Sequence, residues 1–143
     1  MGLLFFFLTL LILSINNGDC AMSEAQVKAA KKLVRNACIP KSKVTEEQVD
    51  GMHDGMWDLD KRGKCYLQCV MNFYKLQKPD NTLDWEAGIK MMETQAPPSL
   101  APHGIKCMKE CKDAAKTLNE KCTAAFEIAK CIYDIDPAQY FWP

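Results

Sequence analysis

The sequence lacks a surplus of charge of either sign, because its 18 Lys and Arg residues are balanced by 18 Asp and Glu residues. A chain without net charge has no bulk electrostatic attraction to nucleic acid or to an anionic membrane surface. The sequence also has only two histidines, and it contains no His-Glu-x-x-His, Gly-x-Ser-x-Gly or glycine-rich phosphate-loop motif. We therefore expect no catalytic activity, no cofactor, no metal and no nucleic-acid partner.

A second long hydrophobic run is missing as well. The single run, LLFFFLTLLILSI at residues 3–15, is too short to span a bilayer, which takes about 20 residues. A polar stretch follows it at residues 16–19, as in a secretory signal, although the charged start that such signals usually carry is absent. We predict a signal peptide at residues 1–20 and a secreted mature domain at residues 21–143 that does not insert into membranes. A membrane anchor or a buried N-terminal helix is the alternative.

Cysteine is abundant, with eight residues, of which Cys20 is expected to leave with the signal peptide. An odd number of cysteines in a short secreted chain predicts a disulfide framework with one thiol left over. Some of these cysteines, together with His103, have spacings compatible with a zinc site, but an oxidising compartment argues against that alternative. The seven remaining cysteines are Cys38, Cys65, Cys69, Cys107, Cys111, Cys122 and Cys131.

The spacing of the cysteines restricts their pairing if they lie on helices. Cys65 and Cys69 are one helical turn apart, as are the cysteines at 107 and 111, so each pair shares a face and bonds to other helices. Cys122 and Cys131 fall on nearly opposite sides of one helix. We therefore expect Cys122 to bond to the helix of the first pair and Cys131 to the helix of the second. Cys38 then bonds to the remaining member of the first pair.

Six helical segments follow from the apolar periodicity and the capping residues. The first begins at Ser23 and ends before Pro40, and the second begins at Thr45. The others are expected at residues 61–76, from about residue 82 up to Pro97, at residues 102–118, and after Asn119. The last segment is apolar over most of its circumference, which is typical of a central helix. The predicted fold class is all-α, a compact six-helix domain stapled by disulfides around an apolar cavity.

Residues suited to line such a cavity are numerous. Six methionines lie between residues 52 and 108, and methionine is frequent where a surface accepts varied apolar partners, although core filling is the alternative for any one of them. The chain ends in aromatic residues, and we expect this tail to dock on the body because an exposed aromatic patch favours aggregation. The candidate ligand-binding residues are Met52, Met56, Tyr66, Val70, Phe73, Tyr74, Trp85, Ile89, Met92, Met108, Phe126, Phe141 and Trp142.

The cysteine pattern resembles that of the six-cysteine insect odorant-binding proteins. It reads Cys-x26-Cys-x3-Cys, then a long gap, then Cys-x10-Cys-x8-Cys, and it runs from Cys38 to Cys131. Together with six expected helices over essentially the whole mature chain, these spacings make the resemblance specific. The resemblance implies a helical fold around an apolar cavity that binds odorants or pheromones. It also implies a C-terminal tail that covers the cavity, as in some members of the family.

The resemblance further implies three disulfides, which are Cys38–Cys69, Cys65–Cys122 and Cys111–Cys131. Cys107 departs from the family pattern, and we expect it to be a free, buried thiol. Two alternatives are that Cys107 replaces Cys111 as the fourth family cysteine, and that Cys107 bonds to Cys20 if cleavage spares that residue. The expected partners are a small hydrophobic ligand and, as a second candidate, a chemosensory receptor, and the expected oligomeric state is a monomer or a weak homodimer.

Two other functions fit the same scaffold. A secreted protein-interaction role predicts a filled core and an exposed aromatic patch. A general lipid or hormone carrier uses the same cavity as an odorant carrier, so the sequence favours neither of the two carriers over the other.

Overall fold

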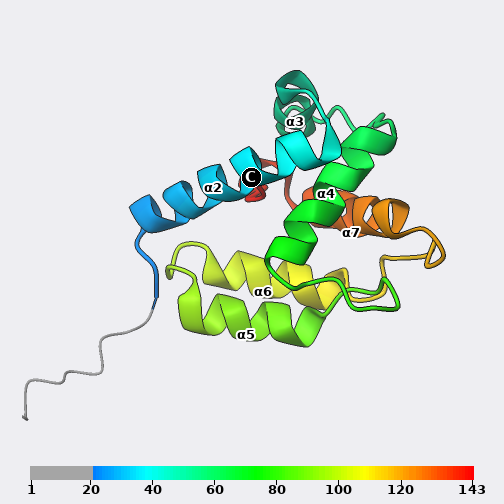
Figure 1. Cartoon of the computed structure of the whole chain (residues 1–143). Coiled ribbons are helices and arrows are strands. Elements are labelled where there is room, and N and C mark those ends of the chain that lie inside the picture. The colour runs from blue at the N-terminus through cyan, green and yellow to red at the C-terminus, as the bar shows by residue number, and fades with distance from the viewer. Residues whose placement is uncertain (1–20) are drawn as a thin grey trace, which may run out of the picture.

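A computed structural model describes residues 21–143 (Figure 1). The predicted signal peptide falls on residues 1–20, outside the described residues. Within residues 21–143, none of the helices combines the length and the hydrophobicity that a bilayer crossing requires. The elements are α2 (Glu24–Ser42), α3 (Glu46–His53), α4 (Lys61–Phe73), α5 (Trp85–Gln95), α6 (Ala101–Glu110), α7 (Lys121–Ile135) and a short 3-10 helix, η1 (Pro137–Gln139).

The all-α prediction is confirmed, and the first two helices begin at the predicted capping residues. At the start of α2, the Ser23 hydroxyl accepts a hydrogen bond from the Gln26 amide, and the Gln26 side chain accepts one from the Ser23 amide. Thr45 caps α3 by accepting from the amide of Gln48. These side chains satisfy backbone N–H groups that have no partner inside the helix.

The first helix is longer than predicted, because α2 continues through Pro40 to Ser42. Proline removes one backbone donor from the last turns of the helix. The Ser42 hydroxyl supplies donor capacity there, lying 2.9 Å from the carbonyl oxygen of Cys38 and 3.2 Å from that of Ile39. The amide of Lys43, which is left-handed with φ of 60°, then closes the helix on the carbonyl oxygen of Ile39. The rule that a helix ends before a proline thus places the end of α2 too early. The helix continues to Ser42, whose hydroxyl provides an additional donor in the last turn.

The fifth predicted helix is shorter than expected, because α6 ends at Glu110 rather than near residue 118. The segment beyond it is held by a carboxylate from α7. Glu127 accepts hydrogen bonds from the amides of Lys116 and Thr117 and from the Thr117 hydroxyl. These amides therefore bond to another element rather than to a helical turn. This tertiary contact leaves no signal in the periodicity of residues 102–118.

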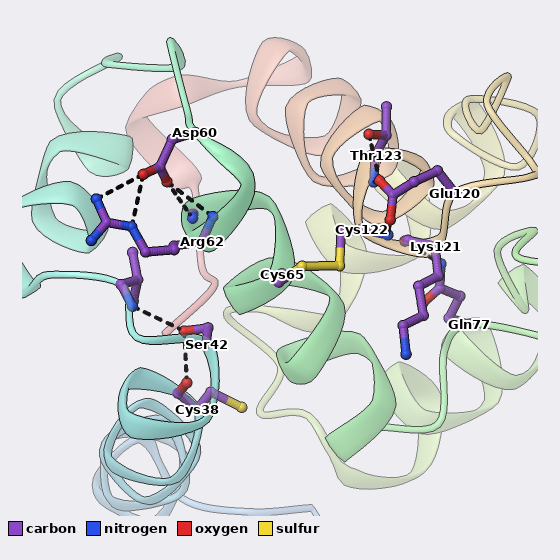
Figure 2. The surroundings of a disulfide bond; sticks show 12 residues. Cys38, Ser42, Asp60, Arg62, Cys65, Gln77, Glu120, Lys121, Cys122 and Thr123 are labelled. Carbon is purple, nitrogen blue, oxygen red and sulfur yellow. Dashed lines mark hydrogen bonds and ion pairs between the residues drawn. A yellow bond between two sulfur atoms is a disulfide. The ribbon is translucent and has the colours of Figure 1, made fainter.

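The start of α7 also differs by one residue from the prediction. Glu120 caps this helix instead of Asn119, because its carboxylate accepts from the amides of Cys122 (3.1 Å) and Thr123 (2.7 Å). Figure 2 shows this cap beside the Cys65–Cys122 disulfide. The same view shows Asp60 capping α4, the helix on the other side of the disulfide. Both helices are thus capped close to the bond that joins them.

Three disulfides join the helices, and they are the three pairs that the resemblance implies: Cys38–Cys69, Cys65–Cys122 and Cys111–Cys131. Helix α7 bonds through Cys122 to α4 and through Cys131 to the end of α6, so it is the doubly stapled central helix that its apolar circumference predicts. Three of the four cysteines in the two four-spaced pairs are in disulfides, which removes the thiolates that the zinc alternative needs.

The helices pack in two groups. Helix α4 packs against α2 and α7, while α5 and α6 form an antiparallel hairpin below them (Figure 1). In the hairpin, a methionine of each helix packs against a glycine of the other helix. A Cβ atom on Gly88 of α5 would collide with Met108, and one on Gly104 of α6 would collide with Met92. Each helix therefore receives a methionine of the other where it has no side chain, and α5 is held to α6 by this packing.

Candidate functional site

A cavity of about 80 Å³ lies between α2, α5 and the C-terminal tail, residues 140–143. The tail is red in Figure 1 and ends beside α2. Most of the wall is aliphatic, sulfur-containing or aromatic, as in sites that hold small apolar ligands. The lining residues are Met22 before α2; Val27, Ala30 and Lys31 of α2; Tyr74 and Leu76 after α4; Met91, Met92 and Gln95 of α5; Ala96 and Leu100 after α5; and Phe141, Trp142 and Pro143 of the tail.

The tail docks on the body as expected. Trp142 is only 4% exposed, and Pro143 is buried as well. The Tyr66 hydroxyl of α4 donates a hydrogen bond of 2.7 Å to a main-chain oxygen of Pro143, and this bond is buried. Burial raises the pKa of Tyr66, so its hydroxyl stays protonated and able to donate. The last residues of the tail thus form one wall of the cavity and are anchored in the core.

An aromatic cluster holds the beginning of the tail. The Tyr140 ring lies 5.1 Å from that of His53, 5.7 Å from that of Trp57 and 5.4 Å from that of Tyr133, edge-on in each case. Such edge-to-face pairs contribute about 0.5–1.5 kcal/mol beyond their burial. The tail is therefore fixed at both ends, by the aromatic cluster at Tyr140 and by the Tyr66 hydroxyl at its last residue.

Three polar side chains face this otherwise apolar cavity. Lys31 is half-buried, and burial lowers the pKa of its ammonium group. Tyr74 is half-buried as well, and burial raises the pKa of its hydroxyl. Gln95 is exposed although it lines the cavity, so the cavity reaches the surface near the end of α5. Polar groups are therefore few in this wall, as in sites that hold small apolar ligands.

The sequence model of the PBP/GOBP family matches residues 20–134, which is most of the chain. The chain belongs to the PBP/GOBP family. General odorant-binding protein 72 of Anopheles gambiae is 25% identical over 121 residues, which cover 85% of this chain and 99% of that protein. The crystal structure of odorant binding protein 4 of Chrysopa pallens is 37% identical, covers 85% of this chain and 99% of its own, and superposes with a TM-score of 0.78.

A second solved structure agrees with this membership. Odorant binding protein 5 of Apis mellifera is 29% identical, covers 86% of this chain and 99% of its own, and has a TM-score of 0.77. The PBP/GOBP family consists of odorant-binding proteins, so the resemblance inferred from the cysteine spacing is confirmed. In this PBP/GOBP chain, the cavity beneath the tail is the candidate ligand-binding site.

The structure brings four of the predicted site residues to the cavity, which are Tyr74, Met92, Phe141 and Trp142. Four others, Met52, Tyr66, Val70 and Met108, are fully buried in the helical core and fill it. Trp85, Ile89 and Phe126 pack partly buried against that core without lining the cavity.

The remaining two predicted residues, Met56 and Phe73, are on the surface, 59% and 49% exposed. Phe73 is the last residue of α4, so no following turn covers it. Met56 follows the turn at Gly55, where φ is +84°, and lies over Gly51 rather than in the interior. The structure therefore places both of them outside the cavity.

Sequence reasoning missed the wall that α2 contributes. Val27 and Ala30 belong to the apolar stripe of this helix, so their inward direction was readable, but the partner of that stripe was not. Lys31 gave the opposite signal, because it lies in a lysine-rich stretch that reads as a solvated face. Only the packing of the tail and α5 against α2 shows that the stripe and Lys31 border a cavity.

Cys107 is a free, buried thiol among the described residues, as expected. Its sulfur lies 3.4 Å from Nε2 of His103, whose ring meets Phe141 of the tail edge-on. Burial raises the pKa of Cys107 to about 11, so the group stays a thiol at neutral pH. Cys107 therefore packs as a small apolar residue beneath the tail.

Proposed function

We propose that this PBP/GOBP chain is a secreted carrier that binds small hydrophobic ligands, odorants or pheromones, in the cavity between α2, α5 and the tail. The observation that supports the proposal is an apolar cavity whose wall includes the chain's own docked tail. Burial of ligand surface there supplies about 25 cal/mol for each Å² removed from water. Binding needs no chemical step, and release requires only that the wall moves.

The size of the cavity implies that the wall adapts to its ligand. A volume of about 80 Å³ is well below the roughly 300–1,000 Å³ of typical ligand pockets. Met22 and Met91, which are not part of the packing between α5 and α6, form part of the wall, and methionine side chains change shape easily because they are unbranched and have three rotatable bonds. Rotation of these side chains, with some movement of the tail, enlarges the cavity without disturbing the disulfide-bonded helices.

The direct test is displacement of a fluorescent apolar probe from the folded protein by long-chain alcohols, aldehydes, esters and fatty acids. Saturable displacement at micromolar concentration by some of them is the result expected of a carrier, and the preferred chain length then measures the enlarged cavity. A protein with three intact disulfides that binds no probe would contradict the proposal and favour the protein-interaction role.

A matched pair of variants locates the binding site. Ala30 lines the cavity, whereas its neighbour Ala29 is exposed and does not line it. We expect Ala30→Phe to weaken probe binding by filling the cavity, and Ala29→Phe to leave it unchanged. Equal probe affinity in the two variants would place the binding site elsewhere.

The general lipid or hormone carrier uses the same cavity, so the ligand panel separates it from odorant carriage by the class of compound that binds most tightly. The protein-interaction role has less support, because the aromatic residues of the tail are docked instead of forming an exposed patch. A chemosensory receptor remains a second candidate partner within the carrier function.

A further inference from the structure

The feature that the carrier function leaves unexplained is a basic side chain in the cavity wall. Lys31 projects from α2, half-buried, beside Ala30 and opposite Met91 and Met92 of α5. Among the described residues it takes part in no ion pair. Burial is the one cause that shifts the pKa of Lys31, and it lowers that pKa without an offset from any nearby carboxylate. Lys31 is thus a partly desolvated ammonium group without an ion-pair partner among the described residues.

Arg35, the next basic residue on the same face of α2, differs from Lys31 because it forms ion pairs within the protein. Arg35 lies one helical turn further along, 2.7 Å from a carboxylate oxygen of Asp50 and 3.6 Å from one of Glu46. Both partners belong to α3, which does not extend to the cavity. The fold therefore pairs Arg35 with two carboxylates, whereas Lys31 makes no such pair and borders the cavity.

A partly buried ammonium favours a negative partner more strongly than an exposed one does, because the local dielectric is lower and solvent competes less. The surroundings of Lys31 are otherwise apolar, so a head group with a negative charge would be bound next to a slot for a hydrocarbon chain. Tyr74 and Gln95 are the two neutral polar residues of the same wall and are available as further hydrogen-bonding partners.

We propose that the cavity selects an amphipathic ligand with a carboxylate head, which pairs with Lys31 while its hydrocarbon chain lies against Met91, Met92 and Trp142. This inference rests on the proposed carrier function and adds the chemical class of the ligand to it. The contrasting possibility is that the lysine stem covers the wall while its ammonium group reaches water, in which case the head group of the ligand makes no difference.

The test compares ligands that differ only in the head group. A saturated long-chain carboxylic acid, its methyl ester and the alcohol of the same chain length displace the apolar probe at neutral pH, below the concentration at which they aggregate. We expect the wild-type protein to bind the acid about tenfold more tightly than the ester, which is the size of a charge-assisted hydrogen bond. In Lys31→Met this advantage should disappear while the affinity for the ester stays the same or rises.

Two further variants make the result specific to Lys31. Lys32 is the next residue of the same helix and is exposed, so Lys32→Met makes the same change in net charge and should leave the tenfold preference intact. Lys31→Arg keeps the positive charge and should keep most of the preference.

The outcomes separate this inference from the function on which it rests. If the wild-type protein binds no probe, the carrier function itself fails. If it binds the probe and all three ligands with equal affinity, the carrier function stands and the role of Lys31 is wrong. A parallel loss of acid and ester binding in Lys31→Met would also overturn the inference, because it would show a structural role for this side chain.

Discussion

The two regions of the molecule are held together in different ways. The stapled region comprises α4, α7 and the adjoining ends of α2 and α6, and it contains the six half-cystines found within residues 21–143. The cavity region comprises the first half of α2, α5 and the tail, none of which contains a cysteine. In the stapled region the interior side chains fill the core, and a more polar hollow of about 430 Å³ lies at the surface beside Cys65, Cys69 and Cys122. The apolar cavity of the other region is closed by methionines, a docked tail and one buried hydrogen bond.

This difference indicates that a small helical protein can maintain an apolar cavity in a region away from its disulfides. An empty space reduces the stability of a folded protein, because the side chains around it lose packing contacts. Disulfides in the stapled region offset that loss by destabilising the unfolded chain, and they do so without touching the cavity. The wall of the cavity can then be made of parts that move separately. Each prediction below tests whether the two regions are as separable as this arrangement implies.

The largest expected effect is on the stapled region. Replacing both Cys65 and Cys122 by alanine opens a loop of 57 residues, and we expect the free energy of unfolding in urea to fall by about 4 kcal/mol. The same change at Cys111 and Cys131, which close a loop of 20 residues, should cost about 3 kcal/mol. Probe affinity under native conditions should stay the same in both variants. A decrease in probe affinity in proportion to the decrease in the free energy of unfolding would show that the stapled region and the cavity region are coupled.

The next effect belongs to the cavity region. Trp142→Ala removes a side chain that is 4% exposed, and it should lower the free energy of unfolding by about 3 kcal/mol. Unlike the disulfide variants, it should also change probe affinity, because Trp142 lines the cavity. Phe73→Ala, at an aromatic residue that is 49% exposed, serves as the control, and its effect on stability should stay within about 0.5 kcal/mol. Similar effects of the two changes on stability would argue against a docked tail.

A smaller effect is expected from the single hydrogen bond that anchors the tail. Tyr66→Phe leaves this main-chain oxygen of Pro143 without its buried donor and should cost about 1 kcal/mol. Amide hydrogen exchange in residues 140–142 should become faster while exchange in α4 and α7 remains unchanged. Tyr74→Phe is the matched control, because the Tyr74 hydroxyl makes no hydrogen bond to any described residue. Faster exchange throughout the chain in Tyr66→Phe would show that this bond stabilises both regions.

The smallest effect concerns a helix cap in the stapled region and depends on pH. Asp60 accepts from the amide of Gly63 and from the Arg62 side chain, and these hydrogen bonds hold the pKa of Asp60 below its ordinary value of 3.8. A lowered pKa in the folded state means that the carboxylate stabilises the protein above about pH 4, and that this contribution is lost as the pH falls through the folded-state pKa.

We therefore expect Asp60→Ala to be less stable than the wild-type protein near neutral pH and equally stable in strong acid. Thermal unfolding measured across this pH range checks the prediction. Asp58→Ala, at an exposed carboxylate outside the cap, is the control for the loss of one charge. A stability difference that does not change with pH would mean that the cap acts through packing and not through its charge.

The stapled region was largely predictable from the sequence. The cysteine spacing identified the helices that α7 bonds to, and the family pattern supplied the partner of each cysteine. Ser23 and Thr45 marked helix starts because a capping side chain acts within three residues of its own position. What failed were the helix ends near Pro40 and residue 118, where a Ser42 hydroxyl and a Glu127 carboxylate provide bonds that periodicity does not describe.

The cavity region was much less predictable. Helix periodicity identifies which face of a helix is buried, but it does not say whether that face meets a filled core or a space. Tyr66 and Met108 were therefore indistinguishable in the sequence from Tyr74 and Met92, although the first two fill the core and the last two line the cavity. The deciding contacts join residues far apart in the chain, such as Tyr66 and Pro143.

The free thiol of Cys107 has a consequence for how the protein acquires its disulfides. During oxidation Cys107 competes with Cys111 for Cys131, and the loop that it would close is only four residues longer than the native loop of 20. Loop-closure entropy barely distinguishes the two loops, so loop length does not select the native pairing, and thiol–disulfide exchange is the reaction that would interconvert the two pairings. Exchange requires a thiolate, and folding raises the pKa of Cys107 to about 11 and buries its sulfur. The native fold therefore protects the Cys111–Cys131 disulfide from exchange with Cys107.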